Sequence, residues 1–98
     1  IGNGGADTIS GGTGNDTFVG GLGRDALQGG AGIDEVDYSQ NTNAVTVNLS
    51  SGSASGDDID TDTVAGIENV TGGSGSDSLT GDANANVLVG NDGIDTLI

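Results

Sequence analysis

Aspartate is the residue of this sequence best suited to chemistry, because it recurs at fixed spacing. Asp7, Asp16, Asp25 and Asp34 follow one another at nine-residue intervals. Carboxylates are hard oxygen ligands of the kind that alkaline-earth cations prefer. The chain has no His and no Cys, and its single cationic residue is Arg24. Thiolate or imidazole metal sites and the usual nucleophile–base pairs are therefore excluded, and we expect this segment to bind a hard cation and not to be an enzyme.

Each of these aspartates is the sixth residue of a nine-residue repeat. Four copies run in tandem from Gly2 to Asp37, for example GGTGNDTFV, and further copies fill the C-terminal third of the chain. Across eight frames the sixth residue is Asp in six, and Glu68 and Asn86 replace it in the other two. The eighth residue is apolar in all eight frames, and these residues are the predicted core: Ile9, Phe18, Leu27, Val36, Val70, Leu79, Leu88 and Leu97.

The repeat predicts a turn followed by a short strand. Its glycines permit positive φ and close backbone approach, so the first six residues favour a turn lined with carbonyl groups. The last three residues alternate in polarity, which is typical of a strand that points its middle side chain inward. Two such units would close one coil, and successive coils would stack about 4.8 Å apart. Since calcium–oxygen bonds are about 2.4 Å long, an ion between coils could touch equivalent carboxylates of both.

This pattern, G-G-x-G-x-D-x-U-x, resembles the RTX, or haemolysin-type calcium-binding, nonapeptide repeat family. The resemblance implies an all-β fold: a right-handed parallel β-roll, or β-solenoid, of 18 residues per coil with several Ca²⁺ ions between its turns. It also implies a secreted, extracellular or cell-surface bacterial protein that leaves the cell by type I secretion and folds from disorder on binding extracellular Ca²⁺. The alternative is a structural or adhesive subunit, which stacks end to end into a filament or forms part of a giant adhesin.

The family places each ion between two turns that are 18 residues apart, and this implies three sites here. One turn gives the carbonyls of its second and fourth residues, the other gives those of its first and third, and both sixth-position aspartates bind. The implied sites are Asn3, Gly5 and Asp7 with Gly20, Leu22 and Asp25; Gly12, Gly14 and Asp16 with Gly29, Ala31 and Asp34; and Gly73, Gly75 and Asp77 with Gly90, Asp92 and Asp95.

Two further pairings depart from the repeat. Glu68 with Asn86 forms a fourth candidate site, in which a longer carboxylate and a neutral amide replace aspartate. Asn43 lies 18 residues beyond Asp25 and is a weaker candidate partner for it in the following coil.

The chain divides into three segments within one expected domain. Residues 1–37 and 63–98 are repeat blocks, and residues 38–62 form a non-consensus insert that we expect to continue the solenoid for about two coils. Within the insert, residues 45–49 alternate as a half-buried strand does. The acidic run from Asp58 to Asp62 is expected to be a solvated loop, and a calcium site of non-EF-hand type is the alternative.

Composition limits the remaining roles and partners. The 98 residues carry a net charge of -14, which opposes nucleic-acid binding because that needs cationic phosphate contacts. The longest apolar run is residues 87–89, so no membrane insertion is expected. Tyr38 and Phe18 are the only aromatic residues, and we expect them to serve in packing. The expected partners are calcium ions and flanking solenoid coils of the same or another chain.

Overall fold

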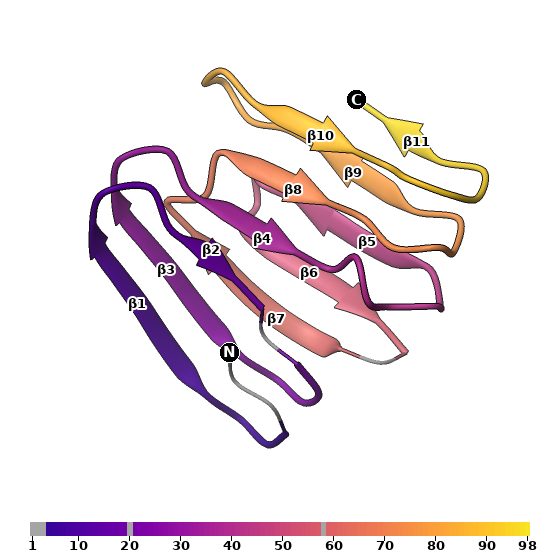
Figure 1. The fold of residues 1–98 in the computed structure, drawn as a ribbon, viewed down its shortest axis with the longest axis horizontal. Coiled ribbons are helices and arrows are strands. Elements are labelled where there is room, and N and C mark those ends of the chain that lie inside the picture. Colours follow the sequence, from indigo (N-terminus) through magenta and orange to yellow (C-terminus); the bar gives the residue numbers. More distant parts are fainter. Residues whose placement is uncertain (1–3, 20, 58) are drawn as a thin grey trace.

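The structure, a computed structural model, describes residues 4–19, 21–57 and 59–98. These residues form two β-sheets that lie face to face (Figure 1). None of the described residues belongs to a helix that is long and apolar enough to cross a membrane. The strands are β1 (Thr8–Thr13), β2 (Thr17–Phe18), β3 (Ala26–Ala31), β4 (Glu35–Asp37), β5 (Val45–Asn48), β6 (Ser53–Gly56), β7 (Asp60–Ala65), β8 (Asn69–Thr71), β9 (Ser78–Thr80), β10 (Val87–Val89) and β11 (Thr96–Leu97).

The two repeat blocks alternate between the sheets. One sheet has the order β1-β3-β7-β6-β5-β9-β11, and the other has the order β10-β8-β4-β2. Within the repeats the pairing is parallel, and paired residues are 18 positions apart, as in Thr8 with Ala26 and Thr17 with Glu35. The predicted all-β arrangement of parallel strands is confirmed. The shortest dimension of the molecule is 19 Å, which fits two sheets about 10 Å apart with side chains on their outer faces.

The insert departs from a simple continuation of the solenoid. In the larger sheet, β6 pairs antiparallel with both β5 and β7, so a hairpin lies between the two repeat blocks. In the smaller sheet the blocks meet directly, since β4 pairs with β8 and Val36 lies opposite Val70. The insert therefore adds strands to one sheet only. A tight turn that reverses the chain cannot preserve the parallel direction, whereas a crossover to the second sheet can.

The predicted core lies between the sheets, apart from its C-terminal member. Phe18, Leu27, Val36, Val70 and Leu79 are buried, and Ile9 and Leu88 are partly buried against them. Leu97 is 49% exposed, so its assignment to the core was wrong. Its strand, β11, ends the order of the larger sheet and pairs only with β9, which leaves one side of Leu97 uncovered. The insert contributes more of the core: Tyr38, Val45, Val47, Leu49, Ala54 and Ile59.

Close approach of successive turns requires glycine at specific repeat positions. Gly32 has φ of +117°, which L side chains rarely adopt, and a Cβ there would clash with the carbonyl oxygen of Gly14 in the preceding turn. Gly4 is different, because a Cβ at this residue would meet no atom within 4 Å.

Two leucines at the same repeat position should differ in their contribution to stability. Leu27→Ala removes a fully buried side chain and should lower the free energy of unfolding by about 2–5 kcal/mol. Leu97→Ala is the matched control and should cost less than about 1 kcal/mol, because its side chain is half exposed. Urea unfolding in the presence of calcium measures both. Equal losses would show that the burial pattern is not that of the folded protein.

A matched pair of glycine substitutions tests the turn packing. Gly32→Ala should destabilise the fold by about 1–3 kcal/mol, through its positive φ and its contact with the neighbouring turn. Gly4→Ala should have little effect. Thermal unfolding in calcium compares the two variants, and a neutral Gly32→Ala would contradict the close stacking of these turns.

Candidate metal centre

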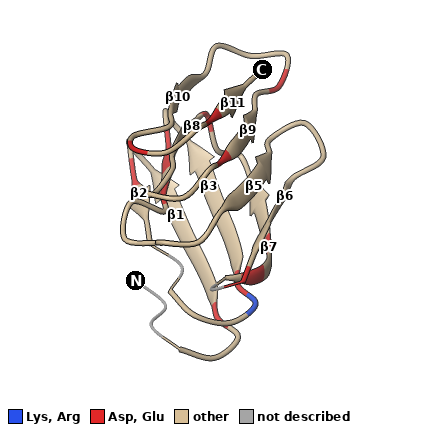
Figure 2. Cartoon of the chain, turned by 90° about the vertical axis from the view of Figure 1, so that its right-hand side faces the viewer, with Lys and Arg blue, Asp and Glu red and all other residues tan. Residues whose placement is uncertain are grey.

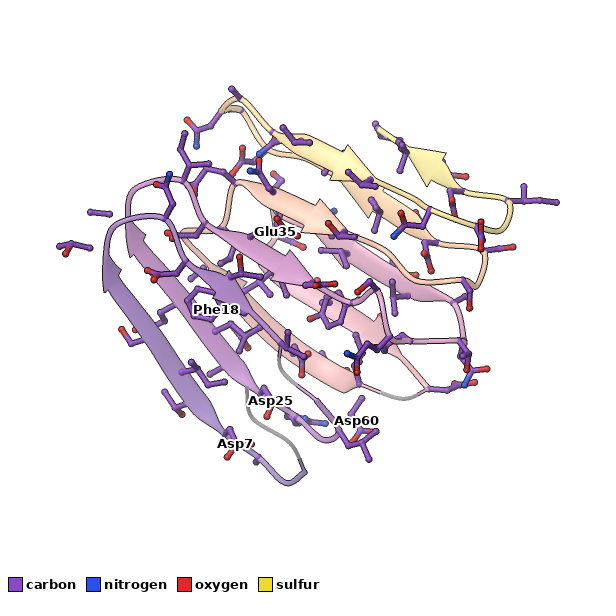
Figure 3. The ribbon with its side chains drawn as sticks, in the orientation of Figure 1. Asp7, Phe18, Asp25, Glu35 and Asp60 are labelled. Atoms are coloured by element: carbon purple, nitrogen blue, oxygen red, sulfur yellow. The ribbon has the colours of Figure 1, made fainter. Side chains whose placement is uncertain are left out.

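The sixth-position aspartates lie where each turn enters its strand. Those of the N-terminal block begin two rows along the stack, and in the C-terminal block the N–H of Asp77 donates to Oδ1 of Asp95 at 2.8 Å. Figure 2 shows acidic residues mostly in the turns and at strand ends. Asp7 and Asp25 occupy neighbouring turns at one edge, as Figure 3 shows. The backbone N–H of Asp7 donates to Oδ1 of Asp25 at 3.0 Å, and that of Asp25 donates to Oδ1 of Asp62 at 2.8 Å. Asp7, Asp25 and Asp62 therefore form the first row.

The second row runs along the opposite edge of the stack. The N–H of Asp16 donates to Oδ1 of Asp34 at 2.8 Å, and the N–H of Asp34 donates to Oε2 of Glu68 at 2.9 Å. Asn86 follows Glu68, and its Nδ2 donates to the Glu68 carbonyl at 2.8 Å. In this fourth predicted pairing, the amide of Asn86 thus bonds directly to the neighbouring turn.

The first row contains a residue that the sequence analysis placed elsewhere. Asp62 was expected in a solvated loop, but it is completely buried next to Asp25. The predicted partner Asn43 does not take this position, and its backbone lies beside Gly75. The pairing was missed because Asp25 and Asp62 are 37 residues apart, not 18. A local signal existed, since Asp62, Thr63 and Val64 repeat the Asp-x-apolar ending of the nonapeptide.

Four of the row carboxylates are incompletely satisfied. Their Oδ2 atoms are buried and have no hydrogen-bond partner: Asp7, Asp16, Asp25 and Asp34. An unpaired buried acceptor costs about 1–3 kcal/mol, and more when it is charged. A cation would supply the missing partner for each oxygen and would offset the charge. The residues present therefore fit a hard metal ion.

Backbone carbonyl oxygens of the adjacent turns lie close to the Oδ2 atoms of these carboxylates. A Cβ on Gly11 would clash with Oδ2 of Asp16 and would lie 2.8 Å from the carbonyl oxygen of Gly29. These two oxygens, both predicted ligands of one site, therefore converge above Gly11. Oδ2 of Asp77 and the carbonyl of Gly90 meet above Gly72 in the same way. The first glycine of the repeat thus leaves the space in which two predicted ligands approach each other.

Other predicted carbonyl ligands also point from one turn toward the next. The carbonyl oxygens of Gly12 and Gly14 lie so close to Gly30 and Gly32 that a Cβ on either would clash. Those of Gly5 and Gly75 face Gly23 and Gly93 in the same manner. No three carboxylates of the described residues cluster closely enough to hold a metal by themselves, so carbonyl oxygens would have to complete each site.

The remaining predicted ligands are backbone carbonyl oxygens of the same turns. Leu22, Ala31 and Asp92 precede Asp25, Asp34 and Asp95 in their respective turns. Asn3 and Gly20 lie outside the described residues. Gly73 serves a second purpose, because its N–H donates to Oδ2 of Asp77 at 2.9 Å.

The first row ends at a tyrosine. The hydroxyl of Tyr38 donates to Oδ2 of Asp62 at 2.9 Å, and both residues are buried. Burial, followed by the adjacent Asp62 charge, raises the pKa of Tyr38 far above its usual value. Burial also raises the pKa of Asp62, although hydrogen bonds from Asp25 and Tyr38 act in the opposite direction. Because its pKa is raised, the Tyr38 phenol keeps its proton over the whole pH range in which an ordinary tyrosine is neutral, and it can donate a hydrogen bond throughout that range.

The comparisons with known proteins agree with this arrangement. The family model of the RTX calcium-binding nonapeptide repeat (4 copies) matches residues 1–36 and 62–97. No curated protein matches the chain. Both matched ranges contain the rows of carboxylates and the glycine turns that support them. The chain belongs to the RTX calcium-binding nonapeptide repeat family.

Proposed function

We propose that this chain is the calcium-responsive part of a secreted bacterial protein, and that binding of extracellular Ca²⁺ drives its repeats from disorder to the ordered β-roll. As a member of the RTX family, the chain is a calcium-binding module. The observation that carries the proposal is the set of four buried Oδ2 atoms without a partner. Without a cation these oxygens oppose folding, so ion binding and folding are coupled.

The ions would be held between turns by the residues that converge there. Asp16 and Asp34 with the carbonyls of Gly12, Gly14 and Gly29 would form one site, and the other sites would repeat this pattern along each row. The carboxylates supply charge, and the glycines let carbonyl oxygens approach them. When bound, calcium supplies positive charge that offsets the repulsion within a row. Irregular mixtures of carboxylate and carbonyl ligands favour Ca²⁺ over Mg²⁺, which requires a near-ideal octahedron.

The segment itself is proposed to be non-catalytic, whatever the rest of its protein does. Support comes from the absence of His, Cys and Lys in the sequence. The extracellular location is supported by family membership, because RTX repeats are typical of secreted bacterial proteins. Secretion by a type I system belongs to the same proposal.

The folding switch predicts a calcium-specific transition. Far-UV circular dichroism of the chain should show a gain in β structure as CaCl₂ is added, and MgCl₂ at the same concentration should not reproduce it. The physical reason is that only the larger ion accepts this ligand set without strain. An equally β-rich spectrum in EDTA and in calcium would contradict the proposal.

Removing one row carboxylate should weaken the calcium response. Asp34→Asn takes away a charged ligand and should raise the calcium concentration at the midpoint of folding about tenfold or more. Asp57→Asn is the matched control, since Asp57 is exposed and lies outside both rows. Isothermal titration calorimetry and circular dichroism measure the shift. The same midpoint in both variants would show that the rows do not bind the ion.

A further inference from the structure

Asp62 differs from the four N-terminal row carboxylates, because both of its oxygens have protein partners. Oδ1 accepts the N–H of Asp25 at 2.8 Å, and Oδ2 accepts the hydroxyl of Tyr38 at 2.9 Å. In Asp25 and Asp34, which are equally buried, Oδ1 is bonded in the same way but Oδ2 has no partner. The Tyr38 hydroxyl therefore fills the position that is open in Asp25 and Asp34.

The geometry of Tyr38 makes this hydroxyl a fixed donor. Its side chain is 2% exposed and belongs to the core between the sheets. The turn after β4 that contains Tyr38 is bonded to β8, since the N–H of Tyr38 donates to the carbonyl of Thr71 at 2.8 Å. A buried ring with few accessible rotamers loses little further entropy when its hydroxyl bonds to Asp62.

Asp77, in the C-terminal repeat block, also has hydrogen-bond partners for both carboxylate oxygens. Oδ1 of Asp77 accepts the N–H of Val45, and Oδ2 accepts the N–H of Gly73, each at 2.9 Å. Val45 belongs to β5, the strand of the insert that pairs with β9. The insert thus supplies a donor to its own last residue, Asp62, and another to Asp77 in the following repeat block.

The last residue of the second row, Asn86, also has hydrogen-bond partners within the protein. Asn86 replaces the aspartate, and its amide both donates to the Glu68 carbonyl and accepts the N–H of Asp82, at 2.8 Å in each case. An amide is neutral and carries its own donor, so this position brings no charge that a cation must offset.

Apolar burial is concentrated in the same part of the chain. Among the described residues, nine of the thirteen buried apolar side chains belong to residues 38–70, whereas three lie before residue 38. The central segment therefore combines most of the hydrophobic stabilisation with two carboxylates, Asp62 and Asp77, whose Oδ2 atoms accept hydrogen bonds from donors within the segment.

We propose that the Tyr38 hydroxyl takes the place of a cation at Asp62, so that residues 38–80 are ordered without calcium and the N-terminal repeats order on them only when calcium is bound. This inference rests on the proposed function, in which calcium orders the repeats. It divides the chain into a metal-independent centre and a metal-dependent N-terminal block.

Hydrogen exchange of the full chain, measured by NMR in EDTA and in calcium, tests this division. In EDTA, the amides of β5, β6 and β7 should be protected from exchange and those of β1 and β2 should not. Calcium should extend protection to β1 and β2. If all strands lose protection together in EDTA and regain it together in calcium, the division is wrong while the calcium switch stands. If calcium changes nothing anywhere, the proposed function itself fails.

Tyr38→Phe isolates the hydroxyl, because the ring and its packing are kept. In EDTA, exchange of the β7 amides should become about tenfold faster or more, as expected for loss of a hydrogen bond to a buried charge. Ser55→Ala is the control, since it removes an exposed hydroxyl from neighbouring β6. Unchanged exchange in Tyr38→Phe would overturn the proposal.

A second background separates pairing of the charge from general packing. Asp62→Asn removes the negative charge that the hydroxyl satisfies. In this background, Tyr38→Phe should have a much smaller effect on β7 exchange than in the native sequence. If Tyr38→Phe accelerated β7 exchange equally in both backgrounds, Tyr38 would act through packing alone. The proposal that its hydroxyl takes the place of a cation would then be rejected.

Discussion

Repulsion between stacked carboxylates is the constraint on which the rest of this structure depends. Parallel pairing in register places equivalent aspartates in successive turns about 4.8 Å apart. Two unit charges at that distance repel by about 3 kcal/mol at an effective dielectric constant of 20. The chain carries a net charge of -14, with Arg24 as its single cation, so side chains of its own cannot neutralise the rows. The fold is stable only where each carboxylate oxygen gains a compensating partner.

The chain meets this requirement differently along its length. In the N-terminal block, the N–H of each turn's aspartate donates to a carboxylate of the next turn, which satisfies Oδ1 of Asp25 and Asp34. Their second oxygens remain unpaired and fit a cation. In the centre, the antiparallel hairpin and the turn after β4 bring Tyr38 to Asp62, while β5 brings the N–H of Val45 to Asp77. The insert is thus a structural element that completes carboxylates, as well as a source of hydrophobic core.

Sequence reasoning succeeded where one period governs the structure. The apolar residue at the eighth position correctly predicted the burial of Leu27 and Val36. The insert was expected to add about two coils, yet Val36 pairs directly with Val70 in the smaller sheet. Sequence reasoning failed where pairing depends on a reversal of the chain. Asp62 reaches Asp25 across 37 residues and a hairpin whose length no nonapeptide count encodes. The hydroxyl of Tyr38 could not be assigned to Asp62 before that register was known.

The most direct measurement is a crystal structure of the chain grown in calcium, with anomalous difference maps that locate the ions. Anomalous peaks are expected beside Oδ2 of Asp16 and Asp34, between the turns to which their neighbouring carbonyls belong. No peak is expected at Oδ2 of Asp62, where the Tyr38 hydroxyl is bound. Rows without any anomalous peak, or an ion that displaces the Tyr38 hydroxyl from Asp62, would contradict these expectations.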